Sequence, residues 1–468
     1  MQPSVDVTRQ TAATRGRLLQ ILGVGFGLAV IIGNTIGAGI LRNPGEVAGH
    51  LPIVWMFLGV WIVGGLYALL GAFSIAELGT MIPRSGGQYV FAHYALGDYA
   101  GFVVGWSDWI STCGTSAAIS VVIGEYLGVL FPSLTGKTVH IAFVIVIAFA
   151  VMQWRGIRWG SSVQNITSLL KALAFVALII ACFALGGKNQ ATTGTAETAP
   201  LAAPSLIGFV LALQAVIYTY DGWTGVIYFS EEVRNPARDI PRSIFGGVLS
   251  IIAIYLLVNL ALLYVLPVSQ IAGANLAMGA AAQVIFGQHG DTIIRSLTII
   301  SMLSAINACQ LMATRVLFAM SRDGLVWSRA VKVNEGGTPT TALFASTAIA
   351  ALFIFGGSFK ESKKIFESII AVLAFFFVVN YAVSFLSVFV LRRREPARDR
   401  PYRTWGYPVT TALTLVGSLT FLGAAIATDI SNSTSPQDLF ETTSFYSLAL
   451  LAASYPAFRL SKWLAGRQ

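Results

Sequence analysis

Charged residues are scarce in this sequence of 468 amino acids. Asp, Glu, Lys and Arg make up 11% of it, apolar residues make up 55%, and the mean hydropathy is +0.72. A soluble protein carries about 25% charged residues, so these charges are too few to cover a soluble surface. The composition excludes a soluble enzyme and a disordered chain, and it indicates a protein whose surroundings are mostly lipid.

Cysteine and histidine are also rare. The three cysteines, Cys113, Cys182 and Cys309, lie inside apolar runs, where we expect packing or lipid contact rather than a secreted disulfide scaffold. The four histidines are scattered without metal-ligand spacing, and the motifs HExxH, GxSxG and CxxC do not occur. We therefore expect no metal, no cofactor and no enzymatic activity.

Long apolar runs dominate the sequence. A membrane span needs about 20 mostly apolar residues, and lipid admits only helices or closed barrels. Runs without alternation predict helices, so the expected fold class is an all-α integral membrane protein. Its twelve transmembrane helices are expected at residues 18–42, 53–77, 99–131, 138–154, 163–186, 204–230, 243–266, 291–320, 341–357, 367–391, 407–428 and 443–460.

The distribution of Lys and Arg predicts the orientation. The first run is longer than the apolar core of a signal peptide and eleven more follow, so we expect it to be retained. With both termini in the cytoplasm, 22 Lys and Arg residues fall inside and seven outside, and Lys171 lies within a helix. This predicts a cytoplasmic N-tail over 1–17 and a cytoplasmic C-tail over 461–468. It also explains the pI of 9.5 without nucleic acid.

Two of the predicted helices are interrupted. The first contains IIGNTIGAGIL, with a break expected from Gly33, and the sixth contains IYTYDGWTGV, with a break expected from Tyr218. Corresponding breaks in two halves point to the binding site of a secondary transporter. Each half has five helices, so 18–186 and 204–391 are predicted to form an inverted repeat, followed by two helices within 407–460. Two Gly-containing helices without a functional break are the alternative.

The breaks suggest an amino acid substrate. The outer half of the first helix would direct the N–H groups of Ala38, Gly39 and Ile40 at a carboxylate. Carbonyls near Ile36 and near the end of the sixth helix would suit an ammonium. Small residues, Gly37 among them, would let the substrate approach the backbone.

Charged and aromatic residues near the breaks have two interpretations each. Lys171 lies about 12 Å inside its helix, either as a protonatable tether to the first break or as a lysine that reaches the cytoplasmic interface. For Asp221, the alternatives are recognition of a cationic side chain of the substrate, proton coupling, or capping of a half-helix. Asp108 is a pathway carboxylate or a contact between helices. Tyr218, Tyr89 and Trp223 are gating candidates, with packing as the alternative.

Other acidic residues are expected to close the cytoplasmic side. Glu77, Glu231 and Glu232 lie at cytoplasmic helix ends, where we expect them to pair with Arg84 or other nearby arginines.

Several segments resemble one family, the amino acid–polyamine–organocation transporters. They are IGNTIGAGIL, FSIAELGTMIPRSGGQYVFAHYALGDYAGFVVGWSDW, WRGIRWGSSVQNITSLLK, YTYDGWTGVIYFSEEVRNPARDIPRSI, SAINACQLMATRVLFAMSRDGL and VLRRREPARDRPYRTWGYP. The YDGW…EE pattern is most similar to the L-type amino acid transporter branch and its bacterial relatives.

The resemblance implies a leucine-transporter-like fold with a 5+5 inverted repeat plus two helices. It implies that Ile36, Gly37, Ala38, Gly39, Tyr218 and Asp221 line the substrate, that Asn307 faces the site from helix 8, and that Lys171 stands where a sodium-driven carrier holds its ion. The loop FPSLTGKT lacks the cysteine that bonds a glycoprotein heavy chain in animal carriers. A bacterial inner-membrane protein without that partner is therefore expected.

The sequence thus predicts a sodium-independent secondary carrier of amino acids that works by alternating access. A sensor that binds without transport, a channel and a polyamine carrier are the competing functions. The identity of the amino acid, proton symport against exchange, and the oligomeric state are left open.

Overall fold

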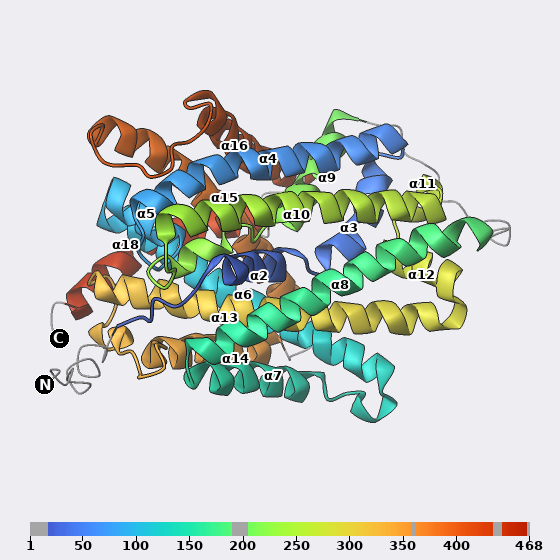
Figure 1. Cartoon of the computed structure of the whole chain (residues 1–468), viewed down its shortest axis with the longest axis horizontal. Helices are drawn as coiled ribbons and strands as arrows, with labels where there is room; N and C mark the ends of the chain where they lie inside the picture. Colours follow the sequence, from blue (N-terminus) through green and yellow to red (C-terminus); the bar gives the residue numbers. More distant parts are fainter. Residues whose placement is uncertain (1–16, 190–204, 358–361, 434–441, 466–468) are drawn as a thin grey trace, which may run out of the picture.

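Helices running along the long axis of the molecule make up nearly the whole structure (Figure 1). The computed structural model describes residues 17–189, 205–357, 362–433 and 442–465. In this part of the chain the only β pairings are two isolated bridges, Leu22 with Val233 and Val333 with Pro339. The longer helices are α2 (Val24–Thr35), α3 (Gly39–His50), α4 (Val54–Met81), α6 (Asp98–Leu130), α7 (Thr138–Trp154), α8 (Ile157–Asn189), α9 (Leu206–Tyr220), α10 (Pro236–Val265), α13 (Gly290–Arg322), α14 (Thr340–Gly357), α15 (Ser362–Arg394), α16 (Val409–Asn432) and α18 (Thr443–Ala465).

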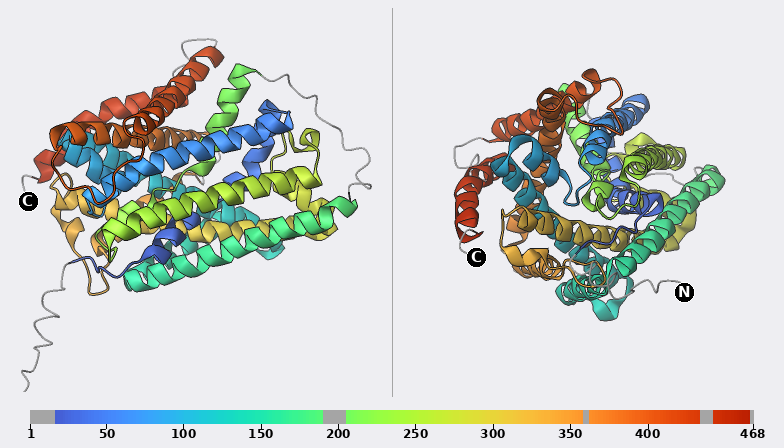
Figure 2. Two further views of the ribbon diagram at one scale, coloured as in Figure 1. Left: turned by 45° about the horizontal axis from the view of Figure 1, so that its top comes forward. Right: turned by 60° about the vertical axis from the view of Figure 1, so that its left-hand side comes forward.

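The membrane-spanning prediction is confirmed. Over the described ranges, nine helices are long and apolar enough to cross a membrane, and a tenth span forms if the bent pair α2 and α3 is counted as one. Helices α7, with 17 residues, and α18 correspond to the other two predicted runs. Apolar side chains on α8, such as Ile166, Leu169 and Ile180, are about 60% exposed, as lipid contact requires. Figure 2 shows that α8 runs along the outside of the bundle.

Both breaks lie about three residues later than the sequence predicted. Helix α2 ends at Thr35 and α3 begins at Gly39, with a bend of 46° between them. Helix α9 ends at Tyr220, and a 3₁₀ helix, η3 (Gly225–Phe229), follows the second break. The glycine that marked the first break, Gly33, is instead a packing position. A Cβ there would lie 2.1 Å from Gln164 Nε2 on α8.

Three short helices were not predicted. Helix α5 (Gln88–Leu96) precedes α6, and α11 (Val268–Ile271) and α12 (Ala277–Phe286) connect α10 to α13. They are too short for a search based on membrane spans. Helix α3 also runs eight residues past the predicted end at 42, because its polar residues lowered the hydropathy there.

The first broken helix occupies the centre of the bundle. Helix α2 packs against α8, α10 and α13, and α3 packs against α9 and α12. The beginning of α2 and the end of α18 lie toward one end of the molecule, which we call the terminal end, and α3 lies toward the other (Figures 1 and 2). The two breaks therefore meet midway along the long axis.

Candidate functional site: a cavity at the two helix breaks

A cavity of about 670 Å³ lies where the breaks meet, within the range of about 300–1,000 Å³ that is usual for small-molecule sites. Side chains from both breaks and from α6, α13 and α15 surround it. Its lining includes Asn34, Thr35, Gly37, Ala38, Gly39, Arg42, Asn43, Gln88, Thr112, Thr115, Tyr218, Thr219, Asp221, Tyr228, Met302, Cys309, Phe377 and Tyr381.

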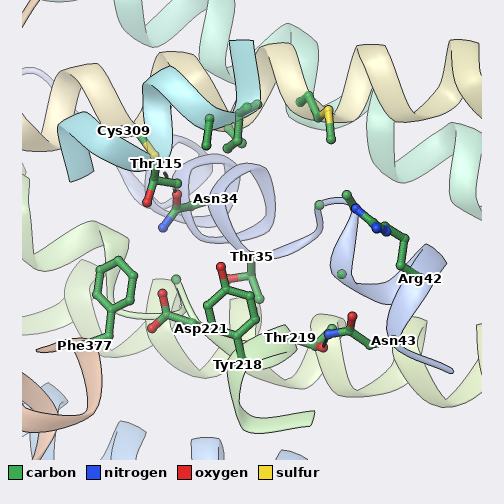
Figure 3. A pocket seen from close by; sticks show the side chains of 18 of the residues that line it. Asn34, Thr35, Arg42, Asn43, Thr115, Tyr218, Thr219, Asp221, Cys309 and Phe377 are labelled. Carbon is green, nitrogen blue, oxygen red and sulfur yellow. Dashed lines mark hydrogen bonds between the residues drawn. The ribbon is translucent and has the colours of Figure 1, made fainter. Parts of the chain in front are cut away.

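The cavity runs from the interior toward the α3 end. Figure 3 shows Asp221 and Phe377 on one side and Arg42 and Asn43 on the other. Arg42 is solvent-exposed, whereas Asp221 is only partly exposed. Tyr218 is 47% exposed although it belongs to a membrane span, because it borders this cavity. The interior is thus reached from the α3 end.

The beginning of α3 has N–H groups without partners beside the cavity. Among the described residues, the N–H groups of Gly39 and Ile40 have no backbone acceptor, since both precede the first internal hydrogen bonds of the helix. The helix end carries about half a positive charge. Gly37 adds space, because a Cβ there would have no neighbour within 4 Å. A substrate carboxylate can therefore reach this end of α3.

The carbonyl groups at the end of α2 are occupied. Lys171 Nζ donates to the carbonyl oxygens of Gly33 at 2.7 Å and Ile36 at 2.6 Å. Ser301 donates to the Ile36 oxygen at 2.8 Å, and Tyr255 donates to the Thr35 oxygen at 2.8 Å. The expectation of a free carbonyl at Ile36 is therefore wrong. Lys171 is 1% exposed, so the alternative that it reaches the interface is also wrong.

Three predicted site residues keep their side chains away from the cavity, although the N–H group of Ile40 is free at the beginning of α3. The side chains of Ile36 and Ile40 are fully buried in the core. Asn307 is also buried and takes part in an amide cluster: it donates to Gln164 Oε1 at 2.7 Å and accepts from Gln153 Nε2 at 2.9 Å. None of the three is among the described residues that line the cavity. Asn307 instead joins α13 to α7 and α8.

Asp221 lies at the second break and lines the cavity. It follows the last residue of α9, and its N–H donates to the Tyr218 carbonyl at 3.2 Å. Its carboxylate accepts a hydrogen bond from Tyr381 at 2.6 Å. Trp223 stacks on the Tyr381 ring, with centroids 5.4 Å apart, and does not line the cavity in the described part of the chain. Tyr381 thus joins α15 to the second break.

Most of the polar lining was missed by sequence reasoning. Asn34, Asn43, Thr112, Thr115 and Thr219 occur singly within helices, where hydropathy and motif spacing do not mark them. Thr35 is the most informative of the others. Its hydroxyl is buried and has no hydrogen-bond partner among the described residues, so a polar ligand could satisfy it.

Comparison with known proteins identifies the family, because the amino acid permease model matches residues 27–452. The chain belongs to the amino acid permease family. The permease is 31% identical to the serine/threonine exchanger SteT of Bacillus subtilis over 418 residues, which cover 87% of this chain and 91% of that protein. It is 28% identical over 396 residues to the human b(0,+)-type amino acid transporter 1, covering 82% and 78%. It is 27% identical over 401 residues to the mouse Asc-type amino acid transporter 1, covering 84% and 74%. It is a multi-pass membrane protein of amino acid transport.

A network of charged groups connects helices at the terminal end of the permease. Asp323, which follows α13, accepts hydrogen bonds from Arg84 at 2.7 Å and from Tyr89 at 3.0 Å. Glu231 pairs with Arg322 at 2.6 Å. Tyr89 is fully buried at this end and does not line the cavity among the residues described. Its contacts belong to the closed end rather than to the substrate cavity.

Two further glutamates pair with arginines in this region. Glu232 accepts two hydrogen bonds from Arg315, at 3.0 and 2.9 Å, and both side chains are fully buried. Glu77 binds Arg392 at 2.6 Å and Arg400 at 3.2 Å. The sequence therefore predicted correctly that these acidic residues pair with arginines. Arg84 itself pairs with Asp323 instead.

A second acid–arginine cluster lies just after α15, outside the spans. Glu395 accepts a hydrogen bond from Arg398 at 2.8 Å, and this bond holds the pKa of the Glu395 carboxyl below its usual value. Arg398 also lies over the ring of Tyr94 on α5. These contacts connect α5 to the segment after α15 at the terminal end.

Proposed function

We propose that this permease is a secondary carrier that moves amino acids by alternating access and that the structure faces the outside of the cell. The cavity reaches solvent at the α3 end, while the ion pairs at the terminal end separate it from the other side. A site open on one side and closed on the other is one of the two states that alternating access requires.

The proposed orientation rests on charge. The excess of Lys and Arg predicts that the terminal end lies in the cytoplasm. Both chain termini would then be cytoplasmic, and α3 would face outward. We propose a bacterial inner membrane as the location. We also propose that the two five-helix segments, 18–186 and 204–391, form an inverted repeat. Parts of both tails lie outside the described residues.

The substrate we propose is an α-amino acid with a small, neutral, polar side chain. Its carboxylate would accept from the N–H groups of Gly39 and Ile40, and its ammonium would lie toward Asp221 and the end of α9. Threonine and asparagine side chains around the cavity suit a polar side chain, as does the serine/threonine exchange named for SteT. A polyamine has no carboxylate for the α3 end, which disfavours a polyamine carrier.

We also propose transport without sodium and without a disulfide-linked heavy chain. Lys171 Nζ donates hydrogen bonds to the carbonyls of Gly33 and Ile36, so it would stand where a cation would otherwise bind. The three cysteines are all buried and unbonded, so none is available at the surface for a partner. These features support transport without sodium and without such a heavy chain.

Counterflow in proteoliposomes tests this function. Vesicles loaded with one unlabelled amino acid at a time should take up labelled serine or threonine, with equal rates in sodium and in choline buffers. Protein-free vesicles are the control. Substrate binding without flux would establish the sensor instead, and a steep sodium dependence would contradict the role given to Lys171.

A further inference from the structure

Asp108 is a buried carboxylate directly behind the cavity wall. It lies midway along α6 and is 1% exposed. The Tyr228 hydroxyl donates to both of its oxygens, at 3.0 and 2.9 Å, and Thr112 donates from 3.4 Å. Tyr228 and Thr112 line the cavity, whereas Asp108 is not among the described residues that do. These two hydroxyl side chains lie between the carboxylate and the cavity.

No cation neutralises Asp108 in the part of the chain that the structure describes. The titratable groups that interact electrostatically with Asp108 are Tyr228, Asp221, Cys113 and Cys309. Tyr381 on α15 acts on Tyr228 and donates its own hydroxyl to Asp221. An ionised carboxylate without a cationic partner is costly at this depth.

Among the described side chains, the buried and half-buried cations of the neighbouring helices are bound to other groups, whereas Arg158, Arg393 and Arg459 are exposed. In α13, Arg315 pairs with Glu232, and in α8, Lys171 binds backbone carbonyls. Arg392 of α15 pairs with Glu77. His93 of α5 and Lys462 of α18 both contact Asp98. Helix α14 has no charged residue, η1 (Pro132–Leu134) has none, and α7 has only His140, near its beginning. A proton is therefore the cation best able to neutralise Asp108.

We propose that Asp108 is a proton-binding site of the permease, connected to the substrate cavity through the Tyr228 hydroxyl. This inference rests on the proposed function. A hydronium ion in the cavity would transfer its proton to the Tyr228 oxygen as the phenolic proton moves to Asp108. The products are a carboxylic acid, an unchanged phenol and water, so atoms and charge balance.

Protonation changes what Tyr228 can do for a substrate. While Asp108 is ionised, the Tyr228 proton is held by the carboxylate. Once Asp108 is protonated, its own O–H donates to the phenolic oxygen, and the Tyr228 O–H is free to donate into the cavity. Substrate binding is therefore favoured by proton binding, and the linkage is reciprocal. In this scheme one proton is carried with each substrate molecule.

The decisive experiment measures substrate affinity against pH in the purified full-length permease, with counterflow in parallel. Between about pH 8 and about pH 5.5 the wild-type affinity for serine should rise about five- to tenfold. Asp108→Asn imitates the protonated form, so its affinity should stay at the acid value at every pH. An imposed pH gradient should drive accumulation in the wild type but not in Asp108→Asn, which should retain counterflow.

Two further variants keep the result interpretable. Asp98→Asn removes an exposed carboxylate from the beginning of the same helix and should leave the pH profile unchanged. Tyr228→Phe removes the hydroxyl that connects the cavity to Asp108 and should abolish the pH dependence of substrate affinity. This variant tests the proton site if Asp108→Asn fails to fold. A pH-independent wild type, or a pH dependence that persists in both Asp108→Asn and Tyr228→Phe, would overturn the inference. Loss of counterflow in the wild type would instead contradict the proposed function.

Discussion

At the scale of single residues, Asp221 combines two roles that the sequence could not separate. It lines the cavity, as a residue that selects charged substrates would, and it accepts a hydrogen bond from Tyr381 at 2.6 Å. One carboxylate oxygen is therefore engaged in holding α15 against the second break. Lys171 binds the backbone of α2 rather than Asp221. We accordingly assign Asp221 mainly to the shape of the site.

Replacing Asp221 with Asn tests that assignment. Asn can still accept from Tyr381, but more weakly, because the acceptor is no longer ionised. We expect the affinities for serine, alanine and lysine to fall by a similar factor, of less than about tenfold. Tyr381→Phe removes the same bond and keeps the charge, so it should produce the same uniform loss. Competition binding measures both, and a loss confined to lysine would make this a carrier of cationic amino acids.

At the scale of the helix, the broken span shows what sequence patterns can and cannot specify. Twenty apolar residues must form a helix in lipid, so the spans were predictable, and clustered glycines correctly marked the two interrupted helices. Glycine does not determine where the helix ends, however. Gly33 remains helical because it packs against α8. The break begins after Thr35, where carbonyl groups bind Lys171 and Tyr255 from other helices.

Contacts between residues far apart in the sequence were also not predictable. Asn307 was expected at the substrate but belongs to an amide cluster with Gln153 and Gln164. Glu77 pairs with arginines more than 300 residues away. Local patterns identify such polar groups as unusual in lipid, but the tertiary packing determines which group satisfies them.

The break itself can be tested with Gly37→Val. Gly37 has no positive φ, and a Cβ there has open space, so the variant should fold and reach the membrane. Its side chain would fill the cavity beside the α3 N–H groups, and we expect serine uptake to fall by at least about tenfold. Gly39→Val is less suitable, because its Cβ would meet Thr219 at 3.2 Å.

The matched control is Gly25→Val, at an exposed position of α2, the helix before the break, without a neighbour within 4 Å. It should transport normally. The amount of each variant in the membrane is measured beside its uptake. Normal uptake by Gly37→Val would remove the broken helix from the substrate site.

At the scale of the whole molecule, the structure is asymmetric along its long axis. The α3 end admits solvent to the cavity, whereas the terminal end joins α5, α13 and the segment after η3 through ion pairs. Surface ion pairs contribute little individually. A network centred on one partly buried carboxylate can nevertheless favour one of two conformations that differ by a few kcal/mol. Asp323 holds this central position, with contacts to Arg84, Tyr89, Arg322 and His93.

Asp323→Asn should therefore shift the carrier toward the state that is open at the terminal end. The apparent affinity for a substrate falls in proportion to the population of the competent state. We expect the half-saturation concentration for uptake from the α3 side to rise about threefold or more, and that for the opposite side to fall. Oriented vesicles measure each side separately. Asp291→Asn is the control, because it removes an ion pair with Arg295 from the other end of the same helix and should change neither value. Unchanged affinity on both sides in Asp323→Asn would show that this network does not hold the carrier closed.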